Sequence, residues 1–296
     1  MKRALIALAL YTAASVAGAD TPETALLKAR SAEFRKDVVQ VADNVYTFTG
    51  HSVQPVSMLI GKDGLAIIDT GMDAQSAQAV LAEMRKITDL PVKAIILTHG
   101  HGDHTGGLPV FAAEGSPDIW ARGNFGDEAH AFEHAGLTIT RKRGARQGGF
   151  LLPPEKRINN GVARAYYPKR GGAVFGADKS IKPTHFLTES RKTIEVAGIK
   201  FDLVALNGET KDALYVWYPD QRVLFSGDNF YKSWPNLYPI RGSAYRDVQA
   251  WADSVDMMLQ ENPDKLVPGH TRPVTNKTLV IEMLTNYRDA IRFVFD

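Results

Sequence analysis

The sequence predicts an α/β fold in which two β-sheets pack face to face and helices cover the outer faces. Short apolar runs, which are typical of buried strands, gather in two blocks at about residues 45–99 and 192–228. Segments with helical periodicity follow in both parts of the chain. With 296 residues, of which 44% are hydrophobic, the chain is long enough to bury a sizeable core.

The first block begins after a polar segment, residues 20–36, that predicts a lead-in helix. Residues 73–86 predict a second helix, because apolar positions recur at helical spacing and Asp73 can cap its start. Strands are expected at residues 45–50, 56–61, 65–70 and 92–99, with a turn at residues 62–64 before the third of them.

The middle of the chain, residues 138–182, is rich in Gly, Arg, Lys and Pro and shows no sustained period. We expect a long ordered loop near the active site; a solvated insertion is the alternative. The second block predicts strands at residues 192–198, 199–206, 213–218 and 222–228, and helices at residues 246–260 and 276–294.

Residues 1–19 have the pattern of a signal peptide. Lys2 and Arg3 precede an apolar stretch that ends in Ala17-Gly18-Ala19, an A-x-A cleavage pattern. The alternative is an uncleaved anchor, but the apolar run is broken by Tyr11-Thr12 and is shorter than the roughly 20 residues that a span needs. We therefore expect a periplasmic or secreted protein without a stable membrane span.

Charge and composition exclude several classes of site. The formal charge of +2 comes from Lys2 and Arg3, because the other 33 of the 35 basic residues balance 33 acidic ones. A nearly neutral mature chain gives no indication of a nucleic-acid partner. The chain has no cysteine, so any metal must be held by His, Asp and Glu.

The segment "ILTHGHGDHTGG", residues 96–107, concentrates metal-ligand residues directly after an expected strand. His99 and His101 alternate in an extended segment and can reach one ion, while Asp103 and His104 lie round the turn and can reach a second. Imidazole and carboxylate are accepted by Zn²⁺, Fe and Mn. The alternative is a polar surface loop, but four ligand-type residues within six positions favour a metal site.

The histidine cluster resembles the H-x-H-x-D-H motif of the metallo-β-lactamase superfamily. Asp69 in "AIIDTG" matches the aspartate that braces the metal loop, Asp228 in "LFSGD" the carboxylate between two metals, and His270 in "LVPGH" a ligand of the second metal. The resemblance implies a metallo-β-lactamase-type αββα sandwich of two mixed sheets flanked by helices. It also implies that residues 20–296 form one catalytic domain.

Glu209 departs from the general superfamily pattern, which usually has a His-Thr pair where this chain has Glu209-Thr210. In this respect the chain is similar to the alkyl and aryl sulfatases of the superfamily, which hold the first metal with two His and a Glu. The interval from Glu209 to Asp228 matches that branch without a gap. The Arg-rich middle of the chain also resembles it.

The segment "NLYPIRGSAYRDVQAWAD", which begins at residue 236, resembles the sulfatase branch most closely. Guanidinium groups offer forked donors to a tetrahedral oxyanion, and an amide or a phenol can orient it. Other positions differ: Lys232 and Pro235 stand where the sulfatases have His. The sulfatases also continue past the point that corresponds to Asp296 into further domains that supply an apolar substrate groove. The resemblance implies these sulfate contacts: Asn236, Tyr238, Arg241 and Arg246.

The leading functional hypothesis is a dinuclear zinc hydrolase that releases alcohol and sulfate from a small anionic alkyl or aryl sulfate ester. Two Zn²⁺ ions per chain are expected, with Fe or Mn as alternatives, and Asp103 is expected to orient the nucleophilic water as well as to bind metal. Alternatives are a hydrolase of β-lactams, lactones or thioesters, a metal protein without hydrolytic activity, an iron-based redox protein and an inactive fragment. The oligomeric state is left open.

Three other parts of the sequence contain histidine but are not expected to bind metal. "HAFEH", residues 130–134, fits the zinc-peptidase pattern H-x-x-E-H, but a solvated helix face is favoured because the main motif already supplies a full ligand set. His51 and His185 have no partner at a metal-ligand spacing, so core or surface positions are expected, with His51 close to the cleft.

Overall fold

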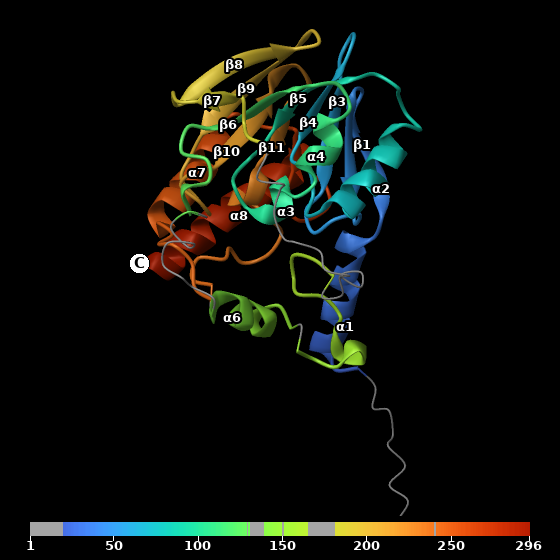
Figure 1. The fold of residues 1–296 in the computed structure, drawn as a ribbon. Helices are drawn as coiled ribbons and strands as arrows, with labels where there is room; N and C mark the ends of the chain where they lie inside the picture. The colour runs from blue at the N-terminus through green and yellow to red at the C-terminus, as the bar shows by residue number, and fades with distance from the viewer. Residues whose placement is uncertain (1–19, 129, 131–138, 150, 165–180, 240) are drawn as a thin grey trace, which may run out of the picture.

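A computed structural model describes residues 20–128, 130, 139–149, 151–164, 181–239 and 241–296 (Figure 1). The expected signal peptide and most of the "HAFEH" segment lie outside the described residues. Among the helices that are described, none combines the length and the apolar character that crossing a membrane requires.

The first sheet has seven strands arranged in the order of the sequence. The first four are joined antiparallel and the last four are joined parallel, so the sheet is mixed. Its strands are β1 Asp37–Ala42, β2 Val45–Thr49, β3 Val56–Ile60, β4 Leu65–Ile68, β5 Val92–Ile96, β6 Asp118–Arg122 and β7 His185–Leu187.

The second sheet has five strands in the order β12-β11-β10-β9-β8. Antiparallel pairing joins β8 through β11, and β12 adds to β11 in parallel. The strands are β8 Arg191–Val196, β9 Ile199–Ala205, β10 Leu214–Tyr218, β11 Val223–Phe225 and β12 Lys265–Val267.

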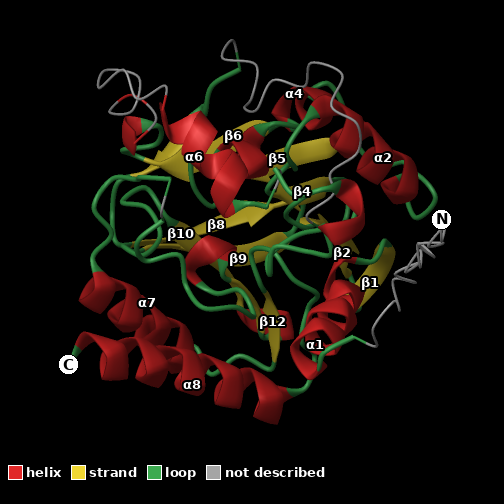
Figure 2. Cartoon of the chain, turned by 90° about the horizontal axis from the view of Figure 1, so that it is seen from below, coloured by secondary structure: helices red, strands yellow, loops and turns green. Residues whose placement is uncertain are grey.

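Three separate apolar clusters show that the sheets form the middle of a four-layer sandwich. One cluster lies between the sheets and joins residues such as Ile68 and Ile96 to Phe201 and Val216. The alternate residues of the same strands face outward, as expected from the two-residue period of a strand. Figure 2 shows the helices on both outer sides of the paired sheets. The predicted αββα architecture of two mixed sheets is therefore confirmed.

The outer helices cover the sheets through apolar stripes. On the first sheet lie α2 (Ala74–Met84), which Asp73 caps as predicted, and α4 (Leu108–Ala112). On the second sheet lie α7 (Val248–Gln260) and α8 (Lys277–Phe295), which bury residues at helical spacing such as Trp251 and Val255. The shorter elements are α1 Pro22–Arg30, η1 Ser31–Phe34, α3 Gly102–Thr105, η2 Pro154–Lys156, η3 Pro219–Gln221 and η4 Gly227–Asn229.

The expected loop over residues 138–182 contains regular structure. Helix α6 spans Ile139–Gln147, so the prediction of irregular structure is wrong there. Its sequence "ITRKRGARQ" has good helix formers but no apolar stripe, which is the signal that periodicity detects. Residues 165–180 of the expected loop lie outside the described part of the chain. Strands β1, β6, β7 and β12 were not predicted; two of them have only three residues.

Candidate metal centre

The predicted ligands come together at one edge of the sandwich because each follows the end of a strand. Strands β4 and β5 are parallel, so Asp69 and His99 emerge on the same side of the first sheet. Strands β9, β11 and β12 share one direction in the second sheet, and they lead to Glu209, Asp228 and His270. A hydrogen bond from the Leu214 N–H to the Thr98 carbonyl, 2.8 Å, joins the two sheets beside these loops.

Asp69 braces the histidine loop, as the resemblance implied. One carboxylate oxygen accepts from the Thr98 N–H, and the other accepts from the Thr98 hydroxyl, both at 2.8 Å. The second oxygen also lies 2.7 Å from His104 Nδ1. Asp69 has φ +55°, in the left-handed region that non-glycine residues rarely adopt, so the backbone accepts strain to aim this carboxylate.

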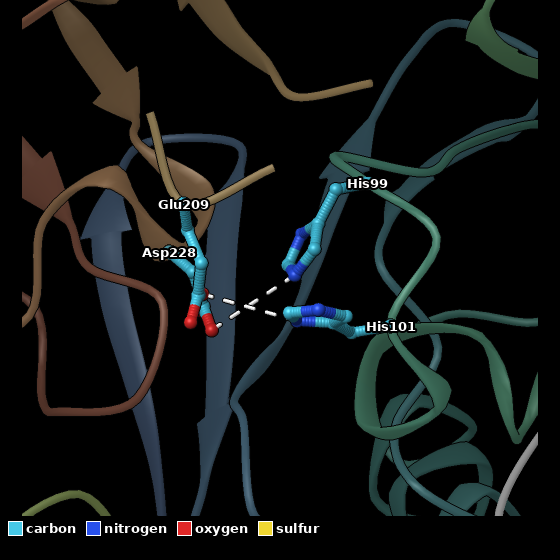
Figure 3. Close-up of side chains that lie close together, drawn as sticks. All are labelled: His99, His101, Glu209 and Asp228. Atoms are coloured by element: carbon cyan, nitrogen blue, oxygen red, sulfur yellow. Dashed lines mark ion pairs between the residues drawn. The ribbon is translucent and has the colours of Figure 1, made fainter. Parts of the chain in front are cut away.

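The first group of converging side chains consists of His99, His101, Glu209 and Asp228 (Figure 3). One ligand atom from each lies within 4.8 Å of those of the others. Glu209 Oε2 lies 3.9 Å from His101 Nδ1, and Asp228 Oδ2 lies 3.9 Å from His99 Nε2. This spacing is larger than a hydrogen bond but suits groups that share an ion.

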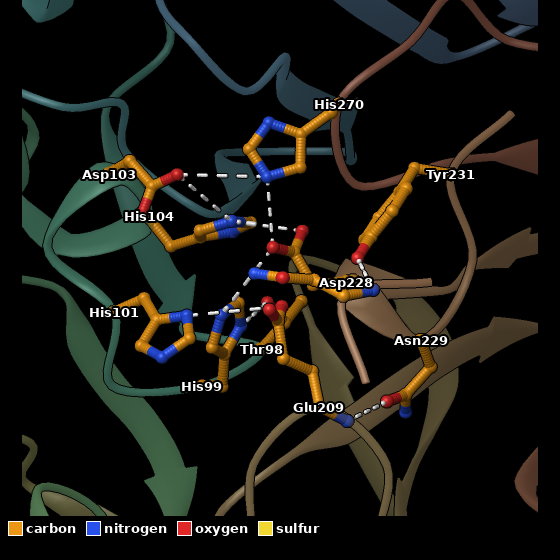
Figure 4. A network of polar contacts seen from close by, with 12 residues as sticks. Thr98, His99, His101, Asp103, His104, Glu209, Asp228, Asn229, Tyr231 and His270 are labelled. Carbon is orange, nitrogen blue, oxygen red and sulfur yellow. Dashed lines mark hydrogen bonds and ion pairs between the residues drawn. The ribbon is translucent and has the colours of Figure 1, made fainter. Parts of the chain in front are cut away.

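The second group consists of Asp103, His104 and His270, and Asp228 lies between the two groups (Figure 4). Asp228 Oδ1 is 3.1 Å from His104 Nε2, and its Oδ2 is 2.9 Å from His270 Nε2. Asp103 Oδ2 lies 3.6 Å from His270 Nε2. The structure thus brings all seven predicted ligands together and gives Asp228 the central place.

The protein groups fit a pair of metal ions. Among the described metal-binding residues, four buried atoms make no hydrogen bond: His99 Nε2, His104 Nε2, Glu209 Oε2 and Asp228 Oδ1. His104 Nε2 and Asp228 Oδ1 lie 3.1 Å apart but form an ion-pair contact rather than a hydrogen bond. Leaving buried polar atoms unpaired costs free energy. Here the unpaired atoms carry lone pairs that point towards one another, as atoms that coordinate metal ions do. The other ring nitrogens of His99, His104 and His270 contact Thr98, Asp69 and the Val53 carbonyl, respectively, as is usual for oriented metal-binding imidazoles.

The electrostatics of the protein groups favour binding of cations. Burial, together with His104 and His101, lowers the pKa of His99 well below its usual value, so His99 is neutral and able to coordinate. Burial opposes protonation of His270, but the Asp228 carboxylate outweighs it and raises the pKa of His270 to about 9. Burial raises the pKa of Glu209 to about 7, while Arg246 opposes this shift.

Two glycines permit the close packing of the acidic ligands. A Cβ on Gly269 would lie 2.1 Å from Asp228 Oδ1, and a Cβ on Gly208 would lie 1.9 Å from Asn229 Oδ1. Asn229 Oδ1 in turn accepts from the Glu209 N–H at 3.1 Å. The segments carrying Glu209 and Asp228 therefore pack closely together, and the two glycine positions leave no room for a side chain.

A cavity of about 2280 Å³ opens over the metal-binding side chains. Its lining includes the metal-binding residues His101, Asp103, Glu209, Asp228 and His270. Much of the remaining wall is apolar and is formed by side chains that include Phe125, Ile181, Phe186, Trp234, Leu237 and Phe295. This chain itself thus supplies an apolar wall beside the polar centre.

The four predicted sulfate contacts do not share one environment. Asn236, Tyr238 and Arg241 line the cavity, and Tyr238 is 73% exposed. Arg246 differs from the prediction, because it is only 2% exposed and is not among the cavity-lining residues. Its Nη1 donates to Glu209 Oε1 and to the Asn236 carbonyl instead.

Several residues near the centre were missed by sequence analysis. Glu128 Oε1 lies 3.9 Å from His101 Nε2, on the side of the ring away from Glu209. The Tyr231 ring packs 5.7 Å from that of His270. The Trp251 indole donates to the Asn229 carbonyl at 2.9 Å. Glu128 and Tyr231 lie outside the motifs, and Trp251 lies in the sulfatase-like segment that begins at residue 236 without a role assigned to it there, so only the folded arrangement reveals them.

The remaining histidines lie outside the seven-residue set. His185 is paired loosely with Asp118 and stacks on Trp120, as expected for a surface position. Burial lowers the pKa of His51. His130 lines the cavity, whereas residues 131–134 of the peptidase-like segment are not described.

A comparison with protein families decides where this fold and this centre belong. The sequence profile of the metallo-beta-lactamase superfamily matches residues 52–270. The chain belongs to the metallo-beta-lactamase superfamily. The match includes all seven residues of the two metal-binding groups. It begins between β2 and β3 and ends at His270.

Within the metallo-beta-lactamase superfamily, the chain is similar to alkylsulfatases. It is 33% identical over 247 residues to a linear primary-alkylsulfatase of Pseudomonas sp. (strain ATCC 19151), covering 81% of this chain and 45% of that protein. It is 28% identical over 269 residues to an alkyl/aryl-sulfatase of Saccharomyces cerevisiae, covering 87% of this chain and 41% of the relative. The chain thus spans less than half the length of these relatives.

Solved structures of superfamily members agree with the fold. The structure of an inverting sec-alkylsulfatase from Pseudomonas sp. superposes with a TM-score of 0.77 at 24% identity, over 87% of this chain and 42% of that chain. The DIM-1 metallo-beta-lactamase superposes with a TM-score of 0.58 at 15% identity, over 88% of this chain and 98% of that chain.

Proposed function

We propose that this metal-dependent hydrolase cleaves sulfate esters of apolar alcohols and uses two zinc ions. The observation that carries the proposal is that Asn236, Tyr238 and Arg241 line the same cavity as the two metal-binding groups. A cavity that a guanidinium, an amide and a phenol all line suits a sulfate head group. The similarity to alkylsulfatases supports the same substrate class.

The chain's own residues have separate parts in the proposed reaction. The two groups would hold the metals, which supply Lewis acidity and an activated water when bound. Asp103 lines the cavity, and its side chain is 25% exposed, so it would orient the nucleophilic water as well as hold metal. Arg241 would hold the sulfate, and its backbone N–H is fixed by Gln147 Oε1 of α6 at 3.0 Å.

The apolar wall favours an ester with a hydrocarbon tail. Trp234 is 52% exposed and Phe295 is 51% exposed, and both line the cavity. Exposed aromatic side chains beside a polar centre are typical of a ligand site rather than of an ordinary surface. The tail would lie along these residues while the sulfate faces the metals.

A substrate panel tests the proposal. Zinc-loaded protein should release inorganic sulfate from dodecyl sulfate or from an aryl sulfate, and Arg241→Ala should raise KM for these esters by about 10-fold or more. Absence of sulfate release, together with hydrolysis of a lactone or a β-lactam, would refute the substrate class.

A general hydrolase of lactams, lactones or thioesters is the second candidate, because the superfamily match covers the metal centre and not a substrate. Arg241→Ala separates the candidates, since it should leave lactone or lactam turnover almost unchanged. We also propose that the protein is periplasmic or secreted. N-terminal sequencing of the mature protein tests this, and Asp20 is the first residue expected.

A further inference from the structure

The buried pair of Arg246 and Glu209 stands apart from the other ion pairs around the centre. Arg246 is 2% exposed and Glu209 is 5% exposed, and Arg246 Nη1 lies 2.5 Å from Glu209 Oε1. Removal of one partner from a buried pair leaves an uncompensated charge in a poorly solvated place. The positive charge of Arg246 therefore stabilises the carboxylate of Glu209, a metal-binding residue.

The two oxygens of Glu209 have different surroundings. Oε1 accepts from Arg246, whereas Oε2 has no hydrogen-bond partner among the described residues and faces His101 Nδ1 at 3.9 Å. One oxygen is thus fixed by a guanidinium, and the other is left for an ion. A carboxylate held in this way can coordinate through Oε2 without rotating.

Arg246 is itself pinned in place. Its Nη1 also donates to the Asn236 carbonyl at 2.6 Å, and its neighbour Asp247 caps α7 through the Ala250 N–H. Nε and Nη2 are buried and without hydrogen-bond partners among the residues described, so the fold retains this arginine at a cost. The described hydrogen bonds of its side chain therefore go only to Glu209 and to the Asn236 carbonyl.

We propose that Arg246 is a positioning residue of the metal centre rather than a substrate contact. It directs Oε2 of Glu209 towards the first metal and offsets the negative charge that Glu209 adds to a group already containing Asp228. The inference rests only on the metal-binding part of the proposed function. It holds whatever ester the enzyme hydrolyses.

The charge argument makes a specific double variant informative. Histidine is a neutral ligand like His99 and His101, so it needs no compensating cation. Glu209→His alone would leave Arg246 buried without its anion, and Arg246→Met alone would leave Glu209 without its cation. The combination of both changes removes both charges and keeps a ligand at position 209.

The test measures zinc affinity by competition with a chromophoric chelator, and zinc content by elemental analysis, for wild type and variants. Arg246→Met should weaken zinc binding by about 10- to 100-fold, with a smaller loss in Arg246→Lys. The double variant should bind zinc more tightly than either single variant. Arg241→Met and Arg85→Met are the controls, and both should stay within about 3-fold of wild type, since Arg85 forms its ion pair with Glu114 elsewhere in the fold.

Three results would overturn the inference. The first is unchanged zinc affinity in Arg246→Met together with a raised KM, which would make Arg246 a substrate contact. The second is a double variant that is no better than the single variants. The third applies if Arg246→Met does not fold. In that case, the inference is overturned if Arg246→Lys binds zinc with wild-type affinity and the double variant does not recover zinc binding. Wild-type protein that binds no zinc would instead refute the proposed function.

Discussion

At the scale of single residues, the metal-binding side chains use one polar atom for a contact with the protein and leave another to face the metal centre. Asp69 fixes His104 Nδ1 and leaves His104 Nε2 directed at Asp228. Glu209 divides its two oxygens between Arg246 and the centre. The residue types could be predicted from the sequence, but the atom that each would offer could not, because that depends on hydrogen bonds between distant segments.

The raised pKa of His270 predicts pH-dependent metal binding. With a pKa of about 9, His270 carries a proton at pH 7, and a metal in the second group must displace it. Burial also opposes protonation of His104 in the same group, but Asp228 and Asp69 outweigh it and raise the pKa of His104 well above its usual value. Affinity should therefore rise by at least about tenfold per pH unit between about pH 6 and 8, with release of at least about one proton. Calorimetry in buffers of different ionisation enthalpy measures this proton release. A metal affinity that does not change with pH would contradict this role of His270.

In the metal-free protein, the stability of the fold should change with pH in the opposite direction. Protonated His270 stabilises the fold at low pH, and this contribution is lost as the pH rises through about 9.

Glu128 should orient His101 from the side opposite Glu209. Glu128→Gln retains the size but removes the charge that faces Nε2, so we expect zinc affinity to fall by about 10-fold. Chelator competition measures it. Glu114→Gln, far from the centre, is the control and should leave zinc affinity unchanged.

At the scale of elements, helix α7 does more than cover the second sheet. Trp251 is fully buried and donates to the Asn229 carbonyl, and the Asn229 side chain accepts from the Glu209 N–H. The helix thereby holds two ligand-bearing segments in register. The sequence predicted a helix over residues 246–260 but gave no indication of this second role.

Replacement of Trp251 tests that role. Trp251→Phe preserves most of the apolar volume but leaves the buried Asn229 carbonyl unpaired, so the free energy of unfolding should fall by about 1–3 kcal/mol. Zinc affinity should fall as well. Trp217→Phe, in the same apolar cluster, is the control: it should reduce stability without a change in zinc affinity. Equal effects of the two substitutions on zinc affinity would contradict a specific role for Trp251.

At the scale of the whole molecule, the metal centre lies where the two sheets meet. His99, His101, Asp103 and His104 follow the first sheet, and Glu209, Asp228 and His270 follow strands of the second. Bound metal would therefore link both halves of the sandwich. Because metal binds the folded chain far better than the unfolded one, it should add to the stability of the whole fold.

Removal of metal should consequently lower Tm. We expect a decrease of at least about 5 °C after chelation and recovery on addition of zinc, measured by differential scanning fluorimetry. Loss and recovery of hydrolysis should follow the same titration. Elemental analysis serves as the control that metal was removed. A constant Tm in metal-free protein would show that the sandwich does not depend on the centre.

From the sequence by itself, periodicity predicted two packed sheets with outer helices, and the spacing of His99, His101, Asp103 and His104 predicted a metal site, because both are local properties of the chain. The resemblance to the metallo-β-lactamase superfamily, rather than local spacing, implied the αββα sandwich, the brace at Asp69 and the distant ligands Glu209, Asp228 and His270. Only the tertiary structure decided that α6 interrupts the expected loop, that Arg246 turns to Glu209 instead of the cavity, and that Glu128 and Trp251 support the centre. These features depend on which side chains meet across separate strands and helices. Burial and partner atoms, which fix the role of an arginine or a glutamate, exist only once the sheets have packed.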